Sequence, residues 1–351
     1  MNEINDIRKE SDFKGITFSK FKVSEVKKEL LNNILHGKIE NACYWLAELL
    51  CAGHFIDIWN SILLVMSQRI HLGNIKLPIY LEMRYQEFRD IVQNGYIDNE
   101  IRMRNNVKIR LLFAEIIAIL SMSNKKHNLE RIKIKPEEFI ITELTSKLRA
   151  DHVNYARSIY KQEDPKELFI AINELQYHLS ENSQNMYNAC YWIEWILYFE
   201  TMCKKKKEKC IAGRRSFVNV DDKSQKDIVW IIWEGIMYES KKRPKIIQNC
   251  INALLNLFTI RYTQAVKRGR IYIIYFSVAL LTEMINYNQE LITNKSKLEI
   301  IKQKNNLIFK EIKKNEITPK IDYLFKGKES TSLEKSISKI EKMNSILFFS
   351  K

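Results

Sequence analysis

The sequence predicts an all-α protein built from two tandem bundles of about five helices each. Glycine and proline, which make the tight turns of sheet-rich folds, number only 9 and 5 in 351 residues. Hydrophobic residues make up 46% of the chain, enough to fill real cores. The motif NACYW occurs at residues 41–45 and again at 188–192. Because single cores usually stop growing before this length, we expect two units.

The resemblance around NACYW extends over five predicted helices in the same order. In that order the first unit reads SEVKKELLNNILHG, NACYW, HFIDIWNSILLVMSQRI, KLPIYLEMRYQEFRDIV and VKIRLLFAEIIAILSMS. The second reads PKELFIAINELQYHLS, NACYW, QKDIVWIIWEGIMYES, KRPKIIQNCINALLNLFTI and RIYIIYFSVALLTEMIN. Ser24 and Asp164 are candidate N-caps of the first helices, and Pro78 and Pro244 fall near the starts of the fourth helices, where a missing amide proton is tolerated. We interpret NACYW as the mark of a duplication.

The NACYW helices have apolar residues at spacings of three and four, which places them on one helical face. These residues are Ala42, Trp45, Leu46, Leu49 and Leu50 in the first copy and Ala189, Trp192, Ile193, Ile196 and Leu197 in the second. Alanine beside tryptophan permits a close approach of helices. The favoured interpretation is a core face, and the alternative is an aromatic binding groove.

The remaining sequence divides around the two units. The expected parts are an N-terminal arm (1–23), repeat 1 (24–124), a connecting segment with a helix (125–163), repeat 2 (164–288) with a basic insertion (203–225), a charged helix (289–326) and a mobile tail (327–351). The charged helix has an apolar stripe of Leu298, Ile301, Leu307 and Ile308, which predicts that it packs on the second unit. The tail ends in Ile346, Leu347, Phe348 and Phe349, which are expected to dock either on the parent molecule or on a partner protein.

The formal charge of +15 favours a polyanionic partner such as nucleic acid, or an anionic membrane surface. The basic insertion is dense enough in charge to predict a solvated loop. A second cluster of Lys and Arg residues precedes the fifth helix of each unit. The candidate phosphate contacts are Lys204, Lys205, Lys206, Lys207, Arg214, Arg215, Arg102, Arg104, Lys267, Arg268 and Arg270. Sequence-independent binding of a phosphate backbone and an ordinary solvated surface remain equal alternatives.

The sequence offers no signature of catalysis or of a cofactor. It contains no GxxxxGK[ST], no GxGxxG, no HExxH and no Cys/His zinc pattern. Cys203 and Cys210 flank the lysine run, which could lower a thiol pKa, but a stray thiol is the favoured interpretation. We expect no enzyme activity, no catalytic residue, no metal and no cofactor. The six cysteines lack CxxC pairs, and neither a signal peptide nor a membrane-spanning run is expected, so a reduced, intracellular protein is predicted.

The segments KIENACYWLAELLCAGHFIDIWN, HLGNIKLPIYLEMRYQEF and IYIIYFSVALLTE resemble a conserved, uncharacterised protein family of the nucleocytoplasmic large DNA viruses. That resemblance implies a role in replication, gene expression or the virion. Residues 39–83 also resemble the C-terminal, collar-like helical domain of clamp-loader-like AAA+ replication-associated recombination proteins, which mediates oligomerisation. The chain lacks their ATPase domain, and Gln68 and Arg69 stand where those proteins have an acidic pair, so clamp loading is not implied.

The function expected from these observations is a non-enzymatic, nucleic-acid-binding scaffold in viral replication or transcription. Its partners would be DNA or RNA and other viral proteins, with a homo-oligomer as a further possibility and no insertion into a membrane. It would act in the viral factory of the host cytoplasm or in the virion. The alternatives are a virion structural component, either a minor capsid or an internal protein, and an enzyme whose site is assembled only by the fold.

Overall fold

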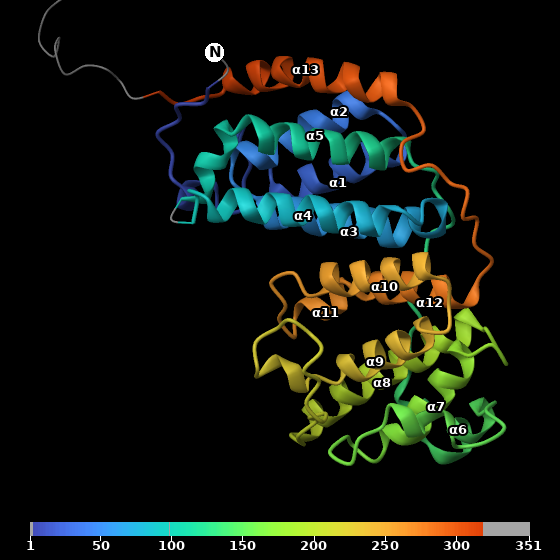
Figure 1. The fold of residues 1–351 in the computed structure, drawn as a ribbon. Coiled ribbons are helices and arrows are strands. Elements are labelled where there is room, and N and C mark those ends of the chain that lie inside the picture. Colours follow the sequence, from blue (N-terminus) through green and yellow to red (C-terminus); the bar gives the residue numbers. More distant parts are fainter. Residues whose placement is uncertain (1–2, 98, 319–351) are drawn as a thin grey trace, which may run out of the picture.

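The computed structural model describes residues 3–97 and 99–318, and these residues form helices with no strand; Ile16 and Lys22 make one isolated bridge. The helices of the first half are α1 (Val23–Leu35), α2 (Ile39–Cys51), α3 (Phe55–Leu64), α4 (Leu77–Gln93) and α5 (Val107–Met122). A π-helical turn, Val65–Ile70, prolongs α3. The prediction of an all-α fold is confirmed (Figure 1).

The helices of the second half are α7 (Leu168–Leu179), α8 (Met186–Lys206), α9 (Val229–Ser240), α10 (Lys245–Phe258), the short α11 (Val266–Gly269) and α12 (Ile271–Thr282). Pro78 lies in the first turn of α4 and Pro244 immediately precedes α10, as predicted. The predicted N-caps are wrong, because α1 already begins at Val23 and α7 begins only at Leu168, after Asp164.

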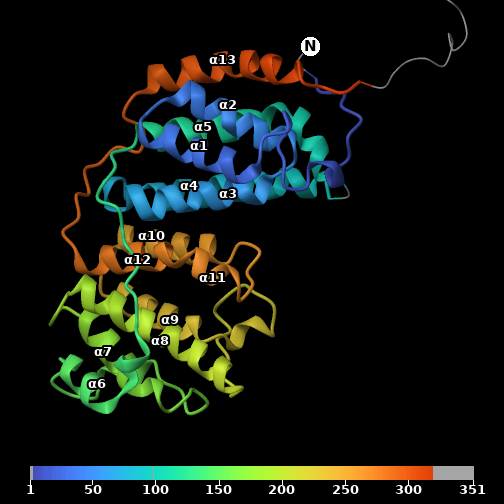
Figure 2. The ribbon, with the colours of Figure 1, turned by 180° about the vertical axis from the view of Figure 1, so that it is seen from behind.

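The two halves are stacked, and the chain crosses between them twice (Figures 1 and 2). An extended segment that follows α5 runs along the back of the molecule to the second half. It contains the short helix α6 (Ile141–Lys147) and two 3-10 turns, Pro136–Phe139 and Tyr155–Ser158, in place of the longer connecting helix that was predicted. A second segment returns after α12 and leads to α13 (Lys295–Lys313). This helix packs on α2 and α5, so the prediction that it packs on the second unit is wrong.

The apolar stripe of α13 explains its position only in part. Leu298 and Ile301 are buried against the first half together with Phe309 and Ile312. Leu307, which the predicted stripe included, is exposed. The stripe that packs therefore continues towards the end of the helix at Phe309 and Ile312, and Arg110 of α5 lies over the Phe309 ring.

Corresponding helices of the two halves make several corresponding contacts. α1 packs on α2, α3 and α5, and α7 likewise packs on α8, α9 and α12. α2 contacts α5 as α8 contacts α12, and α4 contacts α5 as α10 contacts α12. The two fourth helices, α4 and α10, also pack against each other across the seam between the halves. These shared contacts agree with a duplication, which itself stays a prediction.

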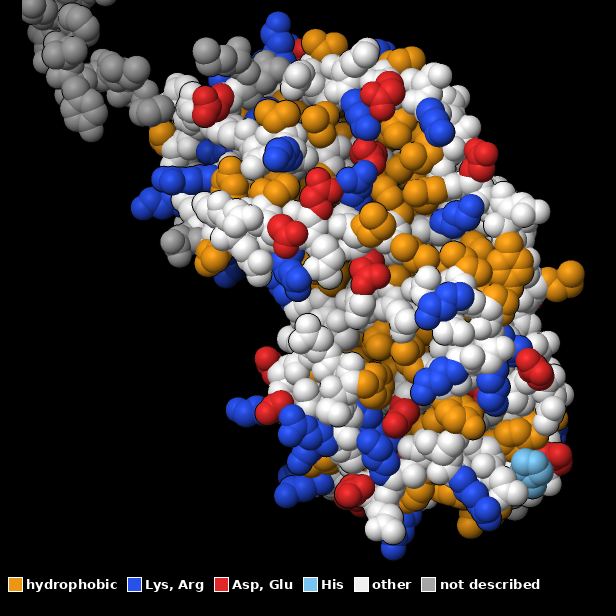
Figure 3. Space-filling view, viewed as in Figure 1, with side chains coloured by type: hydrophobic (Ala, Val, Ile, Leu, Met, Phe, Trp, Pro, Cys, Tyr) orange, Lys and Arg blue, Asp and Glu red, His pale blue; other side chains and the backbone are white. Residues whose placement is uncertain are grey.

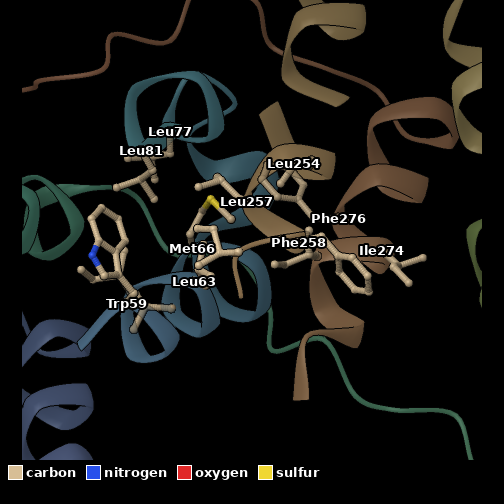
Figure 4. Packing of buried hydrophobic residues seen from close by; sticks show 14 of the residues in the cluster. Trp59, Leu63, Met66, Leu77, Leu81, Leu254, Leu257, Phe258, Ile274 and Phe276 are labelled. Atoms are coloured by element: carbon tan, nitrogen blue, oxygen red, sulfur yellow. The ribbon is translucent and has the colours of Figure 1, made fainter. Parts of the chain in front are cut away.

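A single hydrophobic cluster runs through both halves and across the seam. Figure 4 shows Leu63 and Met66 of the first half facing Leu257, Phe258 and Phe276 of the second, with Trp59 farther into the first half. All of these side chains are almost completely buried. Since apolar burial stabilises by about 25 cal/mol per Å², the seam contributes to folding like the rest of the core.

The NACYW helices bury their predicted apolar faces to different extents. In α8 all of Ala189, Trp192, Ile193, Ile196 and Leu197 are buried, and Trp192 is only 1% exposed. In α2 the corresponding aliphatic residues are buried, but Trp45 is half-buried and packs edge-on against Tyr44 and Phe21. The motif therefore has a packing role in both helices.

The N-terminal segment is part of the packed structure and not a loose arm. Ile4, Phe13 and Phe18 are buried, and the Arg8 guanidinium lies over both phenylalanine rings, 4.7 and 4.6 Å from their centroids. The Ile7 amide donates to the Ile317 carbonyl at 3.1 Å, beyond the end of α13. The segment thus joins the two ends of the described chain.

The apolar terminus Ile346–Phe349, and the tail from residue 327 onwards, lie outside the described residues. Within the described ranges, none of the helices combines the length and the apolar composition that a bilayer crossing needs.

Candidate nucleic-acid interface

The structure divides the predicted phosphate contacts into an exposed and a buried set. Exposed are Lys204, Lys205, Lys206, Lys207, Arg214, Arg102 and Arg268. Buried are Arg104, Arg215, Lys267 and Arg270. The prediction is therefore wrong for the second set, because a side chain enclosed by protein cannot reach a phosphate oxygen.

The lysine run is the last turn of a helix and not a loop. Helix α8 continues from NACYW through Lys206, and Lys207 ends it in the left-handed conformation with φ 61°. The Lys207 amide donates to the Lys204 carbonyl, and the Glu208 amide donates to the Cys203 carbonyl at 2.9 Å. Positive side chains at a helix C-terminus are stabilised by the helix dipole, so the run also supports the helix that carries it.

A buried network of charges lies directly beneath this turn. Lys267 Nζ is 2.7 Å from Glu200 Oε2 and 2.7 Å from Asp227 Oδ1, and Tyr262 donates to the second Asp227 oxygen at 3.0 Å. Burial by itself raises the pKa of the Glu200 carboxyl, but the Lys267 and Lys204 ammonium groups outweigh it and hold that pKa below its usual value. Lys267 therefore anchors the end of α8 from inside.

Arg215 anchors the insertion itself. Its guanidinium is completely buried and bonds to both Asp164 oxygens and, at 2.8 Å, to Glu234. Asp164 also accepts from the Gly213 amide at 2.8 Å and from the Lys161 amide at 2.9 Å. The segment 203–225 is thus fixed to the fold at Arg215, and only its exposed residues have the solvent contact that the predicted loop implied.

Arg104 and Arg270 both bind carbonyl oxygens at helix ends. Arg104 donates to the carbonyl of Cys51, the last residue of α2, and Arg270 donates at 2.8 Å to that of Phe258, the last residue of α10. The final carbonyls of a helix have no partner within it, and a cation is well suited to them. Two of the basic residues that recur before the fifth helices, Arg104 and Arg270, thus have structural roles.

The exposed cations gather around the end of α8. Arg268 Nη2 donates to Thr201 Oγ1, one helical turn before Lys204 and Lys205. We define the basic α8 end as Lys204–Lys207, Lys209 and Arg268. Figure 3 shows Lys and Arg side chains, with Asp and Glu between them, on the part of the lower half where α8 ends in Figure 1.

Some positive side chains of this surface are in ion pairs with carboxylates, and others are not. Lys204 pairs with Glu200 at 3.1 Å, and Arg214 pairs with Asp222 at 2.8 Å. Within the described ranges, no ion pair involves Lys205, Lys206, Lys207 or Lys209. Arg102 belongs to the first half and does not join the cluster. The available positive charge is therefore concentrated at residues 205–209.

The cysteines that flank the lysine run are not activated. Burial raises the pKa of the Cys203 thiol, and burial together with Cys203 raises that of Cys210 to about 12. Both thiols are therefore protonated at neutral pH and weakly nucleophilic. In the described part of the chain, no three His, Cys, Asp or Glu residues come together in a way that could hold a metal ion.

No protein-family model, no curated protein and no solved structure matches this chain. The interpretation of the surface consequently depends on its own geometry.

Proposed function

We propose that this protein is a non-enzymatic helical scaffold of a large DNA virus that binds nucleic acid without sequence preference through the basic α8 end. Its place of action would be replication or transcription in the viral factory. The observation that carries the proposal is the set of unpaired lysines at 205–209, held on a helix end that buried ion pairs fix from below.

Rigid support matters because a phosphate contact must compensate for the conformational entropy lost by a long side chain. The Lys204–Glu200–Lys267–Asp227 network orders the backbone beneath the surface before any ligand arrives. Each phosphate that a lysine neutralises releases condensed counterions, which supplies most of the affinity of non-specific binding. Such a surface provides affinity but no readout of bases.

The experiment replaces Lys205, Lys206, Lys207 and Lys209 with glutamine, which removes charge and retains length. Binding to a labelled duplex is measured by fluorescence anisotropy between 50 and 200 mM salt. Because four lysines no longer neutralise phosphates, the slope of log K against log salt should become less steep by about 3 to 4 units. Lys28, Lys295, Lys297 and Lys310, which are exposed on α1 and α13, provide a control variant of equal charge.

Comparing the two variants distinguishes contacts at the end of α8 from attraction by the overall charge of the protein. If the control weakens binding as much as the α8 variant does, overall charge alone accounts for the affinity and the proposed contacts are wrong. Unchanged binding by the α8 variant has the same consequence. A far smaller effect of the control would locate the interface at the end of α8.

The second candidate function is a virion structural component, and exposed apolar side chains favour it. Met284 is 97% exposed and Ile141 is 78% exposed, and contact with a neighbouring protein in an assembly would remove these side chains from water. Quantitative mass spectrometry of purified virions tests this candidate. A copy number comparable to that of capsid proteins supports it, and absence from the virion removes it.

A further inference from the structure

One buried cation has no acidic residue to balance it. The buried cations of the described residues are Arg104, Arg110, Arg215, Lys267 and Arg270. Arg215 and Lys267 each contact two carboxylates, and Arg104 and Arg110 experience the negative charges of Asp6 and Glu3. Around Arg270 the groups that favour its charge are the phenols of Tyr85 and Tyr262, which are neutral at pH 7.

The contacts of Arg270 are to neutral acceptors. Its guanidinium donates to the carbonyls of Phe258 and Ile260 and, at 3.1 Å, to Asn60 Oδ1 across the seam. Its Nε is buried and has no hydrogen-bond partner among the residues that the structure describes. Burial lowers the pKa of Arg270 to about 10, so the group stays charged at neutral pH. A buried charge that is held by dipoles alone would be stabilised further by a nearby anion.

Arg270 lines a cavity of about 260 Å³ in the seam between the halves. Leu63 and Leu64 of α3 form one apolar wall, and Val266 and Ile273 form the other. Figure 4 shows Leu63 within the apolar side chains that join the two halves. The cavity is therefore largely apolar, with a positive group at one place in its lining.

The other polar groups of the lining add no negative charge to the cavity. Asn60 uses its Oδ1 for Arg270, and no described residue accepts from its Nδ2. Ser61 and Ser67 donate their hydroxyl protons to carbonyls of their own helix. Lys27 also lines the cavity, and its charge is balanced by Asp57, 2.6 Å away.

We propose that this cavity binds a small organic carboxylate with an apolar body. The carboxylate would balance the charge of Arg270 and accept from the Asn60 amide, while its hydrocarbon part contacts the leucine, valine and isoleucine walls. A wholly inorganic anion would leave those walls in contact with water, and a neutral hydrocarbon would leave Arg270 without a counter-charge. The site does not depend on nucleic-acid binding.

Isothermal titration calorimetry with butanoate, hexanoate and octanoate at constant ionic strength tests the proposal. Affinity should rise about three- to fourfold per added methylene while the chain still fits, as apolar transfer requires. Hexanol and hexylamine share the hydrocarbon part and lack the anion, so they should bind at least tenfold more weakly than hexanoate. Equal binding of the three six-carbon probes would overturn the proposal, as would no binding of any carboxylate.

Two cavity-filling variants localise the binding. A Cβ at Gly269 would meet no atom within 4 Å, so Gly269→Leu introduces a side chain at an unobstructed position of the lining, and Leu64→Trp adds bulk from the opposite wall. Both should lower hexanoate affinity at least tenfold, and Gly269→Ala should change it little. Wild-type affinity in both larger variants would show that the carboxylate binds elsewhere. Arg270→Gln should also lose binding, but it removes a helix-end contact and is interpreted only if its melting curve shows a folded protein.

Discussion

The two NACYW helices begin alike and end differently, and this difference locates the distinctive features of the protein. Helix α2 ends at Cys51 and turns sharply through Gly53, whose φ of +82° suits glycine. Helix α8 continues to Lys206 and ends in the basic surface. The first half therefore uses this position for a compact turn, whereas the second half uses it to present charge.

Buried ion pairs support the end of the longer helix and the segment that follows it. Arg215, Asp164 and Glu234 attach the inserted segment, and Lys267, Glu200 and Asp227 hold the helix end. In the first half the buried Arg104 donates to the last carbonyl of α2. The comparison indicates that the second half presents its exposed lysines on a helix end that buried ion pairs hold in place.

The largest expected effect comes from breaking the buried pair beneath the insertion. Asp164→Asn leaves Arg215 with an incomplete counter-charge in a site without solvent, and should lower the free energy of unfolding by about 3 to 5 kcal/mol. Asp222→Asn removes a partner of the exposed Arg214 and should cost less than about 1 kcal/mol. Urea denaturation of both variants measures the difference, and similar losses would contradict the anchoring role of Asp164.

A smaller difference is expected between the twin tryptophans. Trp192→Ala should lower the free energy of unfolding by about 3 to 5 kcal/mol because the side chain is buried, whereas Trp45→Ala should lower it by about half as much because the indole is only partly buried. Thermal melts monitored by circular dichroism would compare them. Equal losses would mean that the two motif helices contribute equally to their cores, contrary to the observed burial.

The helices themselves were predictable from local sequence, because apolar spacing and the prolines Pro78 and Pro244 act over a few residues. The position of α13 was not predictable, since its sequence shows an apolar stripe but does not indicate which half of the protein that stripe covers. The duplication that the motif suggests accounts for the order of helices and leaves the packing of the chain ends open.

The site was predictable only at its exposed lysines. In the segment KRGR, Lys267 and Arg270 are buried while Arg268 is exposed, and nothing local distinguishes them. Their burial depends on Glu200, Asp227, Phe258 and Asn60, which the fold brings in from elsewhere in the chain. The one local signal was the spacing of Glu200 and Lys204, which predicts an ion pair on a helix.

The smallest expected effect is a difference in the pH dependence of stability between the ends of α5 and α12. Lys125 Nζ donates to the carbonyls of Leu120 and Ser121 at the end of α5, and Arg243 donates to that of Leu281 at the end of α12. Burial lowers the pKa of Lys125 to about 8, whereas an unfolded lysine titrates near 10.4. Between these pH values the unfolded chain binds more protons, so the Lys125 contribution makes stability rise with pH.

The measurement is the difference in unfolding free energy between the wild type and Lys125→Met, followed from pH 7 to 10. This difference should stay constant below about pH 8 and then change in favour of the wild type, by less than about 1 kcal/mol because solvent screens a partly exposed group. The same difference for Arg243→Met should not vary, since a guanidinium does not titrate in this range. Parallel pH curves for the two variants would show that Lys125 keeps its proton, and the two helix ends would then be electrostatically equivalent.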